Sequence, residues 1–188
     1  MSPLAEWVLA AALHFAPLET RPKFAGYEET ADEARARYVS VAEDIAEAAE
    51  KSKGPDIPQA AMLLAVAIGE SGLSFDVDKG PCYRKGGYRL RCDGGTSYSL
   101  WQLKAGVVDG VAYGGHEFQG LDKRKLAARA ALRKLEGSLG MCKHLEPQDR
   151  LSAYGAGRCL EGHKSVRERW ALYQRVRDWK PAKKEGAS

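Results

Sequence analysis

The chain has 188 residues, of which 44% are hydrophobic and 29% are charged, and its formal net charge is +4. These values are typical of a soluble protein that buries a sizeable core, so we expect one domain over residues 1–180 and a disordered polar tail at 181–188. They exclude a membrane-spanning chain, because no segment approaches the roughly 20 consecutive apolar residues that a transmembrane helix needs.

The N-terminal part, residues 1–54, is predicted to form helices that serve packing. Apolar residues at helical spacing predict one helix over Pro3–Phe15. Its apolar stretch is short and follows Glu6 rather than a basic segment, so we do not expect a signal peptide. Thr30 and Glu33 form a capping-box pattern that opens a second helix, which should end near residue 49.

A central helix is predicted to begin at Asp56 and to end at Gly72. Residues 60–68 are apolar without a break, which indicates a helix enclosed by other elements. Glu70 stands at its C-terminal end, where the helix dipole and the apolar surroundings both oppose ionisation and raise the carboxyl pKa. A carboxyl that stays protonated near neutral pH is what a general acid requires. The alternative is that Glu70 points into water beyond the helix end.

The four cysteines predict two disulfides and an extracytoplasmic setting. Cys82 and Cys92 bracket a segment that reads as a β-hairpin, and a bridge across it leaves Cys142 to pair with Cys159. A zinc site is the competing interpretation, less favoured because its first two ligands are spaced tightly. Its ligands would be Cys142, His144, Cys159 and His163.

The segment from Tyr98 to Leu103 mixes aromatic rings with hydrogen-bonding side chains. Such a mixture suits a sugar, which presents apolar ring faces and hydroxyl groups. Leu100 and Leu103 are expected in the core, and Trp101 fits either the core or a binding cleft. Residues 106–120 are expected to be irregular, with three possible cleft residues in Tyr113, His116 and Phe118.

The C-terminal third is predicted to be helical over residues 121–139, 148–156 and 165–179. It is also basic, since residues 123–184 hold 17 Lys and Arg against 6 Asp and Glu, whereas residues 1–60 hold 6 against 11. This charge suggests attraction to an anionic polymer, either nucleic acid or cell-wall material, although a solvated helix surface explains most of it equally well. Nucleic-acid binding is the less favoured interpretation, because the arginines form no recognisable reading motif.

Three short motifs, in order along the chain, resemble those of one enzyme family. Residues 68–75 look like the "ES-x-F" motif of soluble lytic transglycosylases and goose-type lysozymes. Residues 99–103 look like their "GLMQ(I/L/V)" motif, and residues 153–157 look like their "AYNAG" motif. The sequence departs from these motifs where Ser99 replaces Gly, Trp101 replaces Met and Gly155 replaces Asn. The resemblance covers about residues 56–160.

The resemblance implies a mainly α, lysozyme-like fold with a small β-hairpin lobe and an inter-lobe cleft. Residues 55–160 would form the catalytic core and residues 161–180 a closing helix. The implied activity is cleavage of the β-1,4 bond between N-acetylmuramic acid and N-acetylglucosamine in peptidoglycan, in the periplasm, the cell wall or a secreted or phage-delivered setting. We expect a monomer that needs no metal or cofactor.

The motifs also imply roles for individual residues. Glu70 becomes the catalytic acid, and Ser71 would orient it. Gln102 would line the cleft near the reacting sugar, and Tyr154 would form a hydrogen bond beside the acid. The remaining predicted substrate-binding residues are Tyr98, Ser99 and Trp101.

Whether a second carboxylate takes part stays open. Inverting hydrolysis needs a base that activates water, roughly 6.5–9.5 Å from the acid. Goose-type lysozymes carry an aspartate six positions before the motif glycine, where this chain has Asp93, although an Asp-Gly pair is equally typical of a turn. Asp76 and Asp78 are further candidates. Lytic transglycosylases need no such base, because the substrate's N-acetyl group assists and its 6-hydroxyl closes onto C1 to give a 1,6-anhydro product.

Transglycosylation is the preferred of these two nearly balanced reactions. The chain also fits a virion or secretion-apparatus component in which a lysozyme-like domain penetrates the wall locally.

Overall fold

A computed structural model describes residues 1–23, 28–79, 96–108 and 110–181. Within these ranges the chain is mainly helical and contains one two-stranded antiparallel sheet. The predicted class, mainly α with a small β-hairpin, is confirmed at this level. None of the helices in the described ranges is long and apolar enough to cross a membrane.

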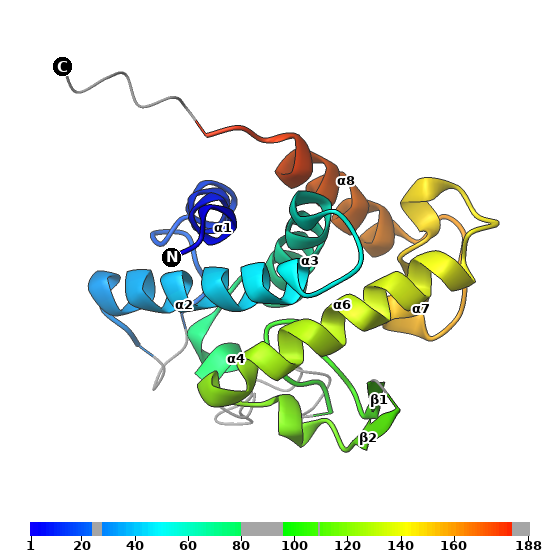
Figure 1. The fold of residues 1–188 in the computed structure, drawn as a ribbon, viewed down its shortest axis with the longest axis horizontal. Helices are drawn as coiled ribbons and strands as arrows, with labels where there is room; N and C mark the ends of the chain where they lie inside the picture. The colour runs from blue at the N-terminus through cyan, green and yellow to red at the C-terminus, as the bar shows by residue number, and fades with distance from the viewer. Residues whose placement is uncertain (24–27, 80–95, 109, 182–188) are drawn as a thin grey trace.

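Helix α3, Asp56–Ser71, lies at the centre of the molecule between α1, α2, α6 and α8 (Figure 1). Its bounds agree with the prediction, and every residue from 59 to 67 is buried. The helix ends where Gly72 adopts a left-handed φ of 61° and donates its N–H to the Ile68 carbonyl at 2.8 Å. A Cβ at Gly72 would lie 2.9 Å from the Pro22 ring, so both conformation and space call for glycine.

Four long helices enclose α3. Helices α1 and α2 pack against each other and against α3, α6 packs on α2 and α3, and α8 runs along α3. Their buried side chains form one hydrophobic cluster with those of α3. The capping box of Thr30 and Glu33 opens α2 as predicted. The bounds are α1 Pro3–Phe15, α2 Ala31–Glu50, α6 Arg124–Met141 and α8 Lys164–Asp178.

Short elements connect these helices. The β1–β2 hairpin pairs Gly106 with Tyr113, Val107 with Ala112 and Val108 with Val111. The expectation that residues 106–120 are irregular was wrong here, because three-residue strands are too short to show an alternating pattern. The hairpin predicted at residues 82–92, with its disulfide, lies outside the described residues. The elements are α4 Phe75–Lys79, β1 Gly106–Val108, β2 Val111–Tyr113, η1 His116–Phe118, η2 Leu121–Lys123, η3 Pro147–Asp149 and α7 Ser152–Ala156.

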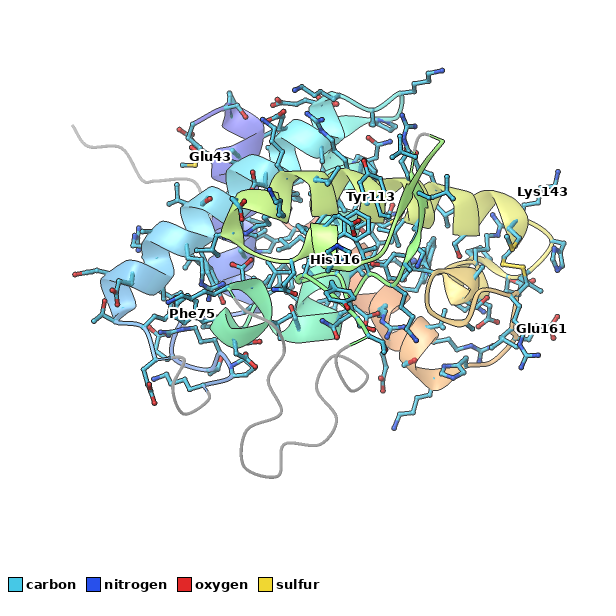
Figure 2. All side chains as sticks on the ribbon, turned by 90° about the horizontal axis from the view of Figure 1, so that it is seen from below. Glu43, Phe75, Tyr113, His116, Lys143 and Glu161 are labelled. Atoms are coloured by element: carbon cyan, nitrogen blue, oxygen red, sulfur yellow. A yellow bond between two sulfur atoms is a disulfide. The ribbon has the colours of Figure 1, made fainter. Side chains whose placement is uncertain are left out.

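Helix α4, marked by Phe75 in Figure 2, is held by a buried ion network. Asp78 receives two hydrogen bonds from Arg124, at 2.8 and 2.9 Å, and a third from Arg37 at 3.2 Å. Arg37 also donates to the Leu73 carbonyl at 2.9 Å. Because each of these side chains is at most 5% exposed, the network ties α4 to α2 and α6 through contacts that water barely screens.

The disulfide between Cys142 and Cys159 is present, with its Cα atoms 5.4 Å apart. It joins the end of α6 to the segment after α7, so it closes a loop that contains η3 and α7. Lys143 and Glu161, just inside and outside this loop, mark one end of the molecule (Figure 2). Because both sulfurs are used in the bond, the competing zinc site loses two of its four ligands.

Candidate active site

A pocket with a volume of about 300 Å³ opens between the C-terminal end of α3, the Tyr98–Leu103 turn, α6, α7 and the first turns of α8. Glu70, Gln102 and Tyr154 all line it. These residues belong to the three separate sequence motifs. The pocket therefore gathers one polar side chain from each motif.

Glu70 forms part of the pocket wall, with its side chain 15% exposed, and does not point freely into water. The Arg169 guanidinium of α8 lies 2.8 Å from Glu70 Oε1. Gly69 permits this approach, since a Cβ there would come within 3.3 Å of the Arg169 stem. An adjacent cation favours the ionised form of a carboxyl, so Arg169 opposes the burial effect that the sequence suggested. Sequence reasoning missed Arg169, because α3 and α8 are far apart along the chain.

Gln102 reaches the pocket from a tight turn. The backbone groups of Tyr98 and Leu103 close this turn with hydrogen bonds of 2.8 and 2.7 Å. Ser99 and Gln102 have left-handed φ angles of 63° and 50°, which non-glycine residues rarely adopt outside constrained sites. The Gln102 amide donates to the Ser99 carbonyl at 3.0 Å, which fixes the side chain against its own turn.

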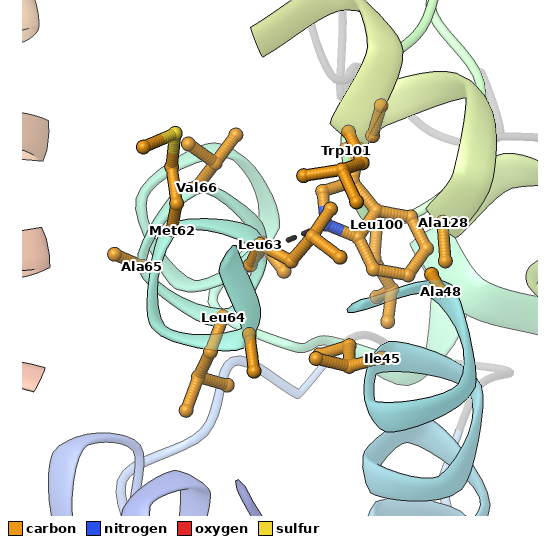
Figure 3. Close-up of a cluster of buried hydrophobic side chains, with 14 of the residues drawn as sticks. Ile45, Ala48, Met62, Leu63, Leu64, Ala65, Val66, Leu100, Trp101 and Ala128 are labelled. Carbon is orange, nitrogen blue, oxygen red and sulfur yellow. Dashed lines mark hydrogen bonds between the residues drawn. The ribbon is translucent and has the colours of Figure 1, made fainter. Parts of the chain in front are cut away.

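Trp101 lies in the core, the first of its two predicted places, and does not line the pocket. Its side chain is fully buried, and its indole N–H donates to the Leu63 carbonyl of α3 at 2.9 Å (Figure 3). The Trp101 side chain therefore serves packing between this turn and α3.

Tyr154 is buried and holds the Gln102 turn in place. Its hydroxyl donates to the Trp101 carbonyl at 2.6 Å. Burial, and secondarily the charge of Glu70, raises the pKa of Tyr154 well above its usual range, so the phenol stays a neutral donor. We expected this hydroxyl to bond beside the acid; the bond observed runs instead to the turn that carries Gln102.

Three other predicted substrate-binding residues have structural roles and do not line the pocket. Ser71 is buried; its hydroxyl donates to the Ala67 carbonyl at 2.7 Å and accepts from the Leu73 N–H at 3.2 Å. Ser99 is buried as well, and its N–H donates to the Gln119 side chain at 3.1 Å. The Ser71 hydroxyl is engaged by the backbone and the Ser99 N–H by a side chain, so their roles in substrate binding stay predictions that this geometry does not support.

Tyr98 is half-buried and packs its ring against residue 115, where a Cβ would come within 2.7 Å of it. It contributes to the turn and does not line the pocket. The possible cleft residues Tyr113, His116 and Phe118 also lie away from it. The rings of Tyr113 and Phe118 pack against each other at a tilt of 40°, with their centroids 5.1 Å apart. Figure 2 labels Tyr113 and His116 at the hairpin.

Two of the candidates for a second carboxylate, Asp76 and Asp78, do not line the pocket. Asp78 is saturated by arginines in the ion network, and Asp76 is 4% exposed within the same short helix. Both are held inside the fold away from the pocket lining, which gives no support to a role as base. Asp93 lies outside the described residues.

Two lysines line the pocket beside the predicted residues. Lys104 follows the Gln102 turn, and Lys134 projects from α6 with its ammonium 5.4 Å from the centroid of the Tyr154 ring. Burial, and then the charge of Lys104, lowers the pKa of Lys134, while Glu70 acts in the opposite direction. The basic C-terminal third was the signal for Lys134, although sequence could not say which of its cations face the pocket; Lys104 lies outside that stretch.

The pocket combines one carboxyl group, an amide, a buried phenol and several cations, so it is equipped for proton transfer to a polar ligand. No group of three or more His, Cys, Asp or Glu side chains in the described part of the chain is placed to hold a metal ion. Comparison of the chain with protein-family models, curated proteins and solved structures gave no match.

Proposed function

We propose that this protein cleaves peptidoglycan glycan strands at the β-1,4 bond between N-acetylmuramic acid and N-acetylglucosamine, with Glu70 as general acid and base. The observation that carries the proposal is the meeting of Glu70, Gln102 and Tyr154 in one pocket. Each residue is the polar member of a motif that resembles the same enzyme family. Three chance resemblances would have no reason to converge in space.

Glu70 would first protonate the glycosidic oxygen, which leaves as the 4-hydroxyl of N-acetylglucosamine. The N-acetyl oxygen of the muramyl residue attacks C1 as that bond breaks. The muramyl 6-hydroxyl then closes onto C1, releases the N-acetyl oxygen and returns its proton to Glu70. The enzyme ends in its starting protonation state, and the product carries a 1,6-anhydro ring.

This transglycosylase route is supported by the charges of the pocket. Among the described residues that line it, Glu70 is the single carboxylate, and the route needs only one. Inverting hydrolysis is the alternative and needs a second carboxylate to activate water. Asp93 is the candidate for that role.

Arg169 would act as a positioning residue for both steps. Its ion pair holds the Glu70 carboxyl in the pocket wall and favours the ionised form, which the second step requires. The first step requires a proton on Glu70, so the pair must loosen as the glycan enters.

An extracytoplasmic location fits this substrate. The Cys142–Cys159 disulfide supports it, because disulfides persist in oxidising compartments and are rare in the cytosol. The bridge also encloses α7, which supplies Tyr154 to the pocket.

The test is clearing of purified cell walls by wild type, Glu70→Gln and Glu168→Gln, followed by turbidity. Removing the proton-transfer group should lower the rate by about 10²–10⁴-fold. Glu168 lies next to Arg169 on α8 with its side chain 64% exposed, so its variant should clear walls as wild type does. Equal clearing by wild type and Glu70→Gln would show that the protein is not this enzyme.

Mass spectrometry of the released fragments separates the two reactions. Transglycosylation predicts 1,6-anhydro ends and hydrolysis predicts reducing ends. If reducing ends dominate, Asp93→Asn becomes the decisive variant: a full hydrolytic rate in it means that Asp93 is not the base.

A further inference from the structure

The Cys142–Cys159 disulfide lies in a small hydrophobic cluster that is separate from the core around α3. Cys142 is fully buried there together with Leu145 and Ala153, and the half-buried Cys159 packs against them. Because Ala153 belongs to α7, this cluster is one of the contacts that hold α7 in the fold.

The loop closed by the bridge, residues 142–159, builds one side of the pocket. Tyr154 and Ala156 line the pocket from within this loop, and Leu160 lines it directly after the loop ends. The Tyr154 hydroxyl also holds the Trp101 carbonyl at 2.6 Å. A displacement of the loop would therefore remove one wall of the pocket together with a support of the neighbouring turn.

Hydrogen bonds from two long helices also hold this loop. The Ser138 hydroxyl on α6 accepts from the Tyr154 N–H at 3.0 Å and donates to the Arg150 carbonyl at 2.8 Å. Asp149 receives two hydrogen bonds of 2.9 Å from Arg167 of α8, whose side chain is 50% exposed. A helix of five residues, such as α7, is not stable on its own. The bridge therefore adds a covalent restraint to a segment with little intrinsic stability.

We infer that the Cys142–Cys159 bridge is a redox-sensitive switch for the pocket, which is assembled when the bridge is formed and opens when the bridge is reduced. For the activity that is switched, the inference rests on the proposed function. A chain in a reducing compartment would then hold an incomplete pocket. Oxidation would complete the pocket in the compartment where disulfides persist.

Reduction requires an external dithiol, because the bridge takes up two electrons and two protons. One thiolate of the dithiol attacks the sulfur of Cys159, the more exposed of the two, and Cys142 leaves as a thiolate. The second thiol of the reductant then attacks the mixed disulfide and releases Cys159. The two protons of the dithiol end on the two cysteines, and the reductant becomes a disulfide. The reverse exchange closes the bridge again.

Amide hydrogen exchange measures the opening of the loop without any substrate. In the closed loop the Tyr154 N–H bonds to the Ser138 hydroxyl at 3.0 Å, and the Gly157 N–H bonds to the Ala153 carbonyl at 2.9 Å. Loss of a cross-link between residues 17 apart should raise the population of the open loop by about 100-fold. Exchange of these two amides should therefore speed up by that factor when a dithiol is added, while the amides of α3 stay better protected than those of α7.

Wall clearing shows whether the opening reaches the pocket. Added dithiol should slow clearing by wild type by about 10–100-fold, as expected for displaced positioning groups, and reoxidation should restore the rate. Cys142→Ser/Cys159→Ser should clear walls slowly with or without the dithiol. Cys82→Ser/Cys92→Ser removes the two cysteines that lie outside the described residues. It should keep both responses to the dithiol, which assigns them to the Cys142–Cys159 bridge.

Unchanged exchange of the Tyr154 and Gly157 amides on reduction would overturn the inference. Equal exchange rates of the α7 and α3 amides in the reduced protein would also overturn it, because the bridge would then support the whole fold and not the loop. Full wall clearing by the reduced protein would do the same. Because the exchange measurement needs no activity, an oxidised protein that fails to clear walls would count against the proposed function alone.

Discussion

Removing a single oxygen atom from Tyr154 tests how the pocket is built. In Tyr154→Phe, the Trp101 carbonyl loses the donor that lies 2.6 Å away in the buried interior. A buried polar group left without its partner costs about 1–3 kcal/mol. For a chain of this size, each kcal/mol shifts the melting temperature by about 2–4 °C, so we expect a decrease of roughly 2–12 °C.

The same variant should lose activity beyond its loss of stability. The Trp101 carbonyl directly precedes Gln102, whose left-handed φ of 50° persists only while the surroundings fix it. Without the Tyr154 hydroxyl the turn can relax, and a displacement of about 1 Å at a positioning residue can cost on the order of 100-fold in rate. We expect wall clearing to slow by about 10–100-fold at a temperature where the variant is fully folded.

Tyr38→Phe is the matched control. Tyr38 is also fully buried, and its hydroxyl donates to the Ala16 carbonyl at 3.1 Å, outside the pocket. It should lower the melting temperature to a comparable extent and leave wall clearing unchanged below that temperature. Thermal unfolding followed by circular dichroism, together with the turbidity assay, measures both effects. A Tyr154→Phe variant that melts at the wild-type temperature would refute the reasoning. An equal loss of activity in Tyr154→Phe and Tyr38→Phe would refute it as well.

Three further predictions concern the supports of the pocket. Replacing Cys142 and Cys159 together by serine removes a cross-link between residues 17 apart, which should lower the free energy of unfolding by about 3 kcal/mol. Wall clearing should also slow, since the closed loop carries α7. An unchanged free energy of unfolding in urea would contradict this. Arg124→Met removes one of the arginines that pair with the buried Asp78 of α4, so the free energy of unfolding measured in urea should fall by about 3–5 kcal/mol. A decrease of less than about 1 kcal/mol would show that this pair does not stabilise the fold as the buried network predicts. Burial and the charge of Lys104 lower the pKa of Lys134, with Glu70 opposing, so folding disfavours its charged form and Lys134→Met should raise the melting temperature at neutral pH. This gain in melting temperature should shrink as the pH rises from the lowered pKa of folded Lys134 to the usual lysine pKa of about 10.4. Above that pH the wild-type amine is neutral in both the folded and the unfolded state. A lower melting temperature of Lys134→Met at neutral pH would contradict the prediction.

The long helices could be predicted because their signals are local. The apolar run of α3 indicated enclosure, and α3 is the helix around which the others pack. The capping box of Thr30 and Glu33 and the left-handed end at Gly72 each depend on a few neighbouring residues, so sequence spacing located them well. The pairing of Cys142 with Cys159 was found by assigning the other two cysteines to a local hairpin.

Contacts between distant segments could not be predicted in the same way. Arg169 gives no sign in the sequence that it faces Glu70, because the contact depends on how α8 lies along α3. Trp101 was ambiguous for a related reason: a turn with two left-handed residues follows neither the helical nor the strand period, so neither period says which side chains face the core. The hairpin at residues 106–113 was missed because its strands are three residues long.

The three motifs share a structural logic that explains which of their residues reach the pocket. At the end of α3 the Ser71 hydroxyl donates to the Ala67 carbonyl and the Gly72 N–H donates to the Ile68 carbonyl, and Glu70 beside them lies on the pocket wall. Ser99 has a left-handed φ of 63°, which costs an L-residue about 1–2 kcal/mol, and its carbonyl accepts a hydrogen bond from the Gln102 amide. The Trp101 indole and the Tyr154 hydroxyl hold this turn through hydrogen bonds of 2.9 and 2.6 Å, so the surrounding structure keeps Gln102 in the pocket lining despite that cost.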